Sequence, residues 1–212
     1  MGVLDIFKTS GLRSLKSIRH SGKRVSEILE AHARYIRGDE SGARADFSGA
    51  DLSRADFGRA NIAFANFHGA NLGGANLREA RLSSADFSQA RMQKADLRKA
   101  DVTESNLSGA NLSEALLGGA ELFRTDLTGA DLRGADLCAA NLREAQIRGV
   151  LLAGAHLGTT ILRETNLDGV DLSGLDLSTT LLPRNYSVQR GSAAGAAGQA
   201  PTGGESAKQG NP

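Results

Sequence analysis

The sequence predicts a solenoid of stacked short repeats, and three observations support this expectation. Every fifth residue from Phe47 to Leu182 is large and apolar, at 28 consecutive positions without a break in frame. The residue two places before each of them is Ala in 20 of the 28 repeats. Only 4% of the 212 residues are aromatic and none is Trp, which disfavours a globule built on aromatic anchors. Because a period of five fits neither an α-helix nor a simple strand, the apolar residues must be buried between successive repeats.

The residue between the Ala and the large apolar position is most often Asp or Asn, as in ADFSGADLSRADF and ANFHGANLGGANL. This pattern, A-(D/N)-(L/F)-x-x, resembles the pentapeptide-repeat family over about residues 45–182. The resemblance implies an all-β solenoid, a right-handed quadrilateral parallel β-helix with four pentapeptides in each coil. Dividing 28 repeats by four gives about seven coils, and we expect the β-helix to occupy residues 43–184.

With four repeats per coil, every twentieth residue stacks on the one before it. One inward column then contains the structural core residues Phe47, Phe67, Phe87, Leu107 and Leu127. The same side carries Gly at 49, 69, 109, 129, 149 and 169, with Gln89 as the exception. Glycine at these places fits turns that require a positive φ.

The two ends of the solenoid differ in sequence. Residues 21–42 predict a helical N-terminal cap and linker, with Ser21 as N-cap, Gly38 at the C′ position, and one face made of Val25, Ile28, Leu29, His32 and Ile36. At the other end Pro183 and Tyr186 offer only a thin cover, which leaves open a homodimer through the C-terminal coil, as the resemblance implies for some members. Residues 185–212 are of low complexity and predict a disordered tail.

Residues 1–20 predict a cationic amphipathic helix. Its apolar face contains Leu4, Phe7, Leu15 and Ile18, and its basic face contains Lys8, Arg13, Lys16 and Arg19. This pattern is typical of helices that lie on an anionic membrane surface. The alternatives are a second cap helix and a helix that docks in a groove of a protein partner.

Side chains suited to catalysis do not converge in this pattern. The repeat frame stacks Asp136, His156 and Asp176 in one outward column, which either binds a metal, or raises the histidine pKa, or is a solvated ladder. Cys138 is in an outward register, where an exposed and unreactive thiol is expected. We therefore predict no enzymatic activity, no cofactor and no metal.

The charge of the repeats bears on partners. Residues 43–182 contain 18 acids and 14 bases, a net charge of −4. The family resemblance implies, as an alternative function, a DNA-mimicking modulator of a type II topoisomerase such as gyrase, but the basic residues cancel much of the acidity that mimicry needs. Direct nucleic-acid binding is not expected. Phe64, Phe123 and Arg124 point outward as candidate contacts with a protein partner.

The sequence as a whole predicts a non-enzymatic scaffold or protein-interaction module. Its N-terminal helix would tether it to a membrane or to an unidentified protein partner. The absence of a signal segment and of a long apolar stretch predicts a cytoplasmic protein, peripheral on the inner face of the cytoplasmic membrane if the helix binds lipid.

Overall fold

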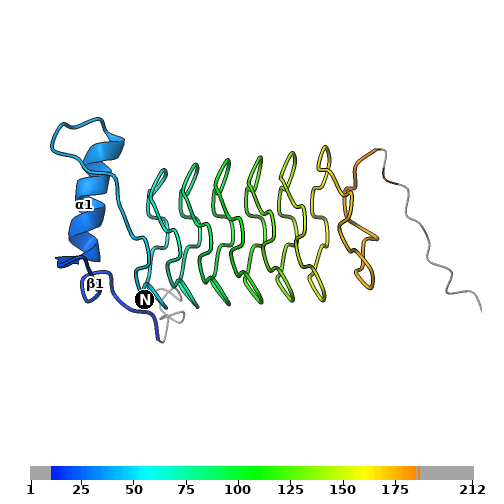
Figure 1. The fold of residues 1–212 in the computed structure, drawn as a ribbon, viewed down its shortest axis with the longest axis horizontal. Coiled ribbons are helices and arrows are strands. Elements are labelled where there is room, and N and C mark those ends of the chain that lie inside the picture. The colour runs from blue at the N-terminus through cyan, green and yellow to red at the C-terminus, as the bar shows by residue number, and fades with distance from the viewer. Residues whose placement is uncertain (1–10, 185, 187–212) are drawn as a thin grey trace, which may run out of the picture.

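The computed structural model describes residues 11–184 and Tyr186 (Figure 1). Three regular elements come first: β1 (Arg19–His20), β2 (Lys23–Arg24) and α1 (Val25–Ile36). A long stack of coils follows, with α1 lying across its N-terminal end (Figure 1). The result is a rod with one helical end.

The coils stack with a period of 20 residues. Parallel β-bridges join Asp46 to Asn66, Asn66 to Asp86 and Asp86 to Asn106, and the other sides of the rod repeat this pattern. Between coils, the Phe47 amide donates to the Asn66 carbonyl at 2.7 Å. Within a coil, the Ala50 amide donates to the Phe47 carbonyl at 3.0 Å and closes a four-residue turn. Each pentapeptide is therefore one short bridge followed by one turn.

The turns up to position 174 each have a residue in the left-handed region, whether or not it is glycine. The φ angles at positions 49, 54, 59 and so on to 174 all lie between 54° and 73°. Gly49 and Gly69 have φ 62°, and Gln89, the exception in their column, has φ 59°. A positive φ at the third residue alone is the φ pattern of a type II turn. The predicted role of the glycine column is confirmed, but the geometry extends to all four sides.

The interior is one continuous buried cluster. Phe47, Phe67 and Phe87 stack with ring centroids 5.1 Å and 4.7 Å apart, and none of the three is exposed. Leu107 and Leu127 continue the column at 0% and 1% exposure. Large side chains alternate with Ala along each coil, which fills a narrow interior at high density.

Residues 11–20 are not helical, so the prediction of a helix over residues 1–20 is wrong for the part that the structure describes. Residues 1–10, including Leu4, Phe7 and Lys8, lie outside the described residues. Arg13 instead pairs with Ala55 in a parallel bridge, and β1 and β2 form an antiparallel hairpin. Ser21 and Gly22 have φ 48° and 79°, a two-residue type I′ turn that fits the strand twist.

Helix α1 covers the first coil through one face. It begins after Arg24, not at Ser21, and the Arg24 amide donates to Glu27 Oε2 at 3.0 Å. Gly38, with φ 78°, occupies the predicted C′ position. His32 is fully buried, and its Nδ1 accepts a hydrogen bond from the Ala45 amide at 3.0 Å. Burial lowers the His32 pKa, because the charged form would lose its hydration.

The last coil departs from the regular stack. Within the described part of the chain, residues 166–178 form no backbone hydrogen bond to the coil before them. The two ends of this arc are held: the Thr165 hydroxyl donates to the Leu142 carbonyl, and the Thr180 hydroxyl donates to the Leu157 carbonyl at 2.7 Å. A bridge between Ile161 and Leu181 completes the attachment. The irregular winding is visible at the C-terminal end in Figure 1.

Candidate interaction surfaces

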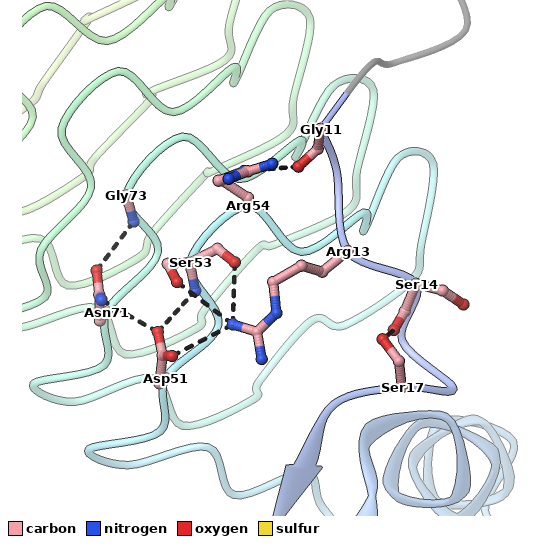
Figure 2. A network of polar contacts seen from close by, with 9 residues as sticks. All are labelled: Gly11, Arg13, Ser14, Ser17, Asp51, Ser53, Arg54, Asn71 and Gly73. Carbon is pink, nitrogen blue, oxygen red and sulfur yellow. Dashed lines mark hydrogen bonds and ion pairs between the residues drawn. The ribbon is translucent and has the colours of Figure 1, made fainter.

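The segment before the hairpin is fastened to the first coil by a polar network around Arg13 (Figure 2). The Arg13 amide donates to the Arg54 carbonyl at 2.6 Å, and its guanidinium Nη1 lies 3.2 Å from Asp51 Oδ2. Arg54 returns a bond from Nε to the Gly11 carbonyl at 2.6 Å. Arg13 is therefore engaged with the rod rather than presented to a membrane.

The network also changes the acidity of Asp51. Hydrogen bonds from Ser53 lower its pKa most, and the charge of Arg13 lowers it further. The Asp51 carboxylate is 63% exposed, so the ion pair contributes at most about 1 kcal/mol. Most of the attachment must come from the backbone bonds and from buried apolar side chains.

Two of the apolar residues predicted to face a membrane are used inside the molecule. Ile18 is 1% exposed and belongs to the same buried cluster as Val25. Leu15 is partly buried and packs against that cluster. The predicted apolar face is thus an internal packing surface at these two positions, because the hairpin turns the chain back onto the first coil.

The basic residues of the hairpin remain on the outside. Residues 11–24 contain five bases and no acid. Arg19 pairs with Arg24 and His20 with Lys23 across the two strands. Lys16, Arg19, Lys23 and Arg24 are all exposed. We call these four residues the cationic tip. It keeps the predicted positive charge at this end of the rod, but on the hairpin and, for Lys16, on the turn before it.

The outward aromatic candidates differ from each other. The Phe64 residue is 48% exposed. Phe123 is half-buried, with the Arg124 guanidinium 4.7 Å and the Arg143 guanidinium 5.6 Å from its ring centroid. Arg124 Nε also donates to Glu144 at 2.7 Å, and this bond raises the Arg124 pKa. Phe64 therefore offers the more accessible surface.

The stacked column around His156 is interrupted in the structure. Asp136 and His156 are joined by a bridge, whereas His156 and Asp176 are not, because Asp176 lies in the arc that leaves the stack. Among the described residues, no group of three or more potential ligands could hold a metal ion. Cys138 is exposed, and its hydrogen bond with Asp136 raises the thiol pKa. A thiol with a raised pKa is a poor nucleophile at neutral pH.

Two sets of polar contacts were not predicted from the sequence. The Asp or Asn of a repeat accepts a bond from the amide two residues later, as Asp46 does from Ser48 at 3.0 Å. Where the Ala register contains Ser or Thr, the buried hydroxyl donates to a carbonyl 23 residues earlier, as Thr125 does to Val102 at 2.9 Å. The first contact explains why Asp and Asn recur between the Ala and the large apolar position, and the second explains why Ser and Thr can replace Ala; the five-residue period alone explains neither.

The family model described as pentapeptide repeats (eight copies) matches residues 43–78, 65–103, 80–119, 105–143, 120–158 and 145–182. Together these matches cover more than half of the chain. The chain belongs to the pentapeptide-repeat family, and its fold is the β-helix solenoid that the five-residue pattern predicts.

Several solved structures of pentapeptide-repeat proteins are similar to parts of the chain. Rfr23 from the cyanobacterium Cyanothece 51142 is 27% identical, and the match covers 52% of this chain and 86% of that chain with a TM-score of 0.36. A protein from the Arabidopsis thaliana thylakoid lumen is 40% identical over 48% of this chain and 68% of that one, with a TM-score of 0.25. Full-length QnrB1, a plasmid-mediated fluoroquinolone resistance protein, is 25% identical over 68% of this chain and 81% of that one, with a TM-score of 0.30. No curated protein matches the chain.

Among the described residues, none of the helices is long and apolar enough to cross a membrane.

Proposed function

We propose that this chain is a non-enzymatic scaffold for protein interactions, which docks through the cationic tip on an anionic membrane surface. The observation that supports docking is the set of four exposed bases, Lys16, Arg19, Lys23 and Arg24, in a stretch that contains no acid. Each base near an anionic surface contributes about 1 kcal/mol. The inner face of the cytoplasmic membrane is such a surface, and an acidic face of a protein partner would offer the same chemistry.

The scaffold role is supported by the form of the rod. Its core side chains point inward, and most side chains of its outer ladders are polar and repeat at the coil-to-coil spacing, with Leu116, Leu151 and Leu181 as exposed apolar exceptions. Such a surface presents side chains in register to a partner and buries no substrate. Phe64 lies near the same end of the rod as the cationic tip, and it is the exposed aromatic residue that we assign to partner contact.

A flotation experiment tests the docking proposal. The full-length protein is mixed with vesicles of phosphatidylcholine alone or with added phosphatidylserine. The variant R19A/K23A/R24A is compared with R91A/K99A/R148A, which removes the same charge from exposed positions on the rod. We expect the first variant to lose affinity for the anionic vesicles by a factor on the order of 100, from three bases at ~1 kcal/mol each, and the second to bind like the parent protein.

The flotation result has two clear contrary outcomes. Equal binding of both variants would show that the cationic tip plays no part. If the parent protein itself does not bind the anionic vesicles, the cationic tip would instead be assigned to a protein partner.

The alternative, a DNA-mimicking modulator of a type II topoisomerase, needs a row of acids free to replace phosphates. Several acids of the rod are instead paired with bases: Glu79 with Arg59, Asp96 with Arg98, Glu114 with Lys94, Asp131 with Arg133 and Glu144 with Arg124. We therefore expect the purified protein to leave gyrase supercoiling unchanged. Inhibition at stoichiometric concentrations would favour the alternative.

A further inference from the structure

The last coil of the rod has the internal geometry of the coils before it. Within the arc of residues 166–178, Gly169 and Gly174 have φ 72° and 73°, as the other turns do. The Leu175 amide donates to the Leu172 carbonyl at 3.3 Å and closes the usual four-residue turn. What the arc lacks is the set of backbone hydrogen bonds to the coil before it (Figure 1). It is therefore a formed coil that is not hydrogen-bonded in place.

The residues of the Ala register separate the bonded part of this coil from the unbonded part. At its two ends the register contains Thr165 and Thr180, whose hydroxyls donate to carbonyls 23 residues earlier. Inside the arc it contains Val170 and Leu175, which are larger than Ala and have no hydroxyl. From Ala45 to Ala140 every position of the register is Ala, Ser or Thr. The unbonded arc thus coincides with the two bulky apolar residues.

Bulk in this register is tolerated once and fails where it is repeated. Val150 stacks on Ala130, and the Leu151 amide still donates to the Ala130 carbonyl at 3.0 Å. Val170 is the next residue of the same column, and beyond Val150 the bonds between coils stop. Because a protein interior is close-packed, extra methyl groups at positions sized for Ala push the backbone apart. Steric crowding therefore accounts for the place at which the arc leaves the stack.

We propose that the arc of residues 166–178 is a gate, which is open in this structure and closes onto the preceding coil, and that the bulk of Val170 and Leu175 holds it open. Among the described residues, three amides of the preceding coil have no backbone acceptor, and we call them the edge amides: Ile147, Leu152 and Leu157. The three equivalent amides one coil earlier each donate at 2.8 Å to the coil that follows, and we call them the reference amides: Leu127, Leu132 and Leu137. The gate determines whether this backbone edge is paired within the rod or open to a strand from another protein.

Charge is the other force that can hold the arc away. A hollow of about 670 Å³ lies where the arc begins, and its lining includes one base, Arg148, and three acids: Glu144, Glu164 and Asp168. Glu144 is paired with Arg124. Arg148 lies twenty residues before Asp168, so their opposite charges favour closure. Glu164 and Asp168 are alike in charge, and the experiment therefore includes them.

Amide hydrogen exchange of the full-length protein tests the proposal. In the parent protein, the edge amides should exchange at least about tenfold faster than the reference amides. The variant V170A/L175A should slow the edge amides to the rates of the reference amides, because it restores the residue for which the register is sized. Leu151→Ala is the matched control, since it removes the same atoms from a side chain that points outward and is exposed, and it should leave both sets unchanged.

A second variant keeps the proposal falsifiable if alanine loosens the arc. V170T/L175T supplies hydroxyls that reach the carbonyls 23 residues earlier, as those of Thr165 and Thr180 do, and should also slow the edge amides. Equal exchange of the two sets in the parent protein, or edge amides that neither variant slows, would overturn the proposal. Slower exchange in E164Q/D168N would assign the opening to charge and would overturn it as well. None of these outcomes depends on the cationic tip, so vesicle binding and the gate succeed or fail separately.

Discussion

Shortening Ile18 to Ala distinguishes a hairpin packed on the rod from a helix lying on a membrane. Ile18 is 1% exposed and packs within the buried cluster that contains Val25 and the first coil. The substitution removes three carbon atoms, which corresponds to about 2.4 kcal/mol at ~0.8 kcal/mol for each buried methylene. A cavity that relaxes only in part adds to this value, so the expected loss is about 2–5 kcal/mol.

The assay is urea unfolding followed by circular dichroism, with amide hydrogen exchange of α1 as a local measurement. Repeat proteins open locally, so the α1 amides should lose protection before those of the central coils. Lys16→Ala is the matched control, because Lys16 lies two residues away and is exposed. It should change the free energy of unfolding by no more than about 0.5 kcal/mol.

If residues 11–20 formed a helix on the surface, Ile18→Ala and Lys16→Ala would behave alike. Equal unfolding curves for both variants would therefore refute the packing described for the hairpin. A large loss for Ile18 with unchanged α1 protection would refute only the claim that the hairpin holds the helix in place.

Three further predictions concern the rod and its cap. Burial lowers the His32 pKa below its value of 6.5 in the unfolded chain, so the unfolded state binds more protons. The contribution of this group to stability is therefore complete above about pH 6.5 and falls as the pH drops below it. The urea midpoint should be lower at pH 5.0 than at pH 7.5, and His32→Gln should make this difference smaller. Thr125→Val removes the hydrogen bond to the Val102 carbonyl and should lower the free energy of unfolding, measured with urea, by about 0.5–1.5 kcal/mol. An unchanged free energy of unfolding would mean that the hydroxyl contributes nothing to stability. Gln89→Gly should raise the melting temperature, since a residue with φ 59° is strained by about 1 kcal/mol; a lower melting temperature would contradict this account.

The fold of the rod was predictable because one physical constraint repeats in every coil. A large residue at each fifth position from Phe47 can be buried only if the coils stack, and the Ala register leaves room for it. The role of glycine at positions such as Gly49 followed from the same frame. The right-handed sense, the number of coils and a C-terminal homodimer stay predictions.

The N-terminal end was harder to predict because its pattern fits two structures. Leu15 and Ile18 are spaced for a helical face, yet the same spacing serves a hairpin that folds onto the rod. The Ser21–Gly22 pair, with both residues at positive φ, was the available signal for a hairpin. The Arg13 network depends on contacts with residues about 40 positions away, which no local pattern contains.

Because of the arc of residues 166–178, we expect the rod to unfold from its C-terminal end. Each earlier coil is hydrogen-bonded to its successor, whereas this arc packs on the core through Leu167 and Leu172 without backbone hydrogen bonds to the preceding coil, so we expect the C-terminal coil to open first. The opposite end is closed by α1 and the hairpin, which precede the coils in the chain and leave the ribosome before them. During synthesis the coils would then fold in order, from the closed N-terminal end toward the C-terminal end. Chains that stop short near residue 165 would keep a stable rod, while chains that lack the first 45 residues would have no closed end from which to start.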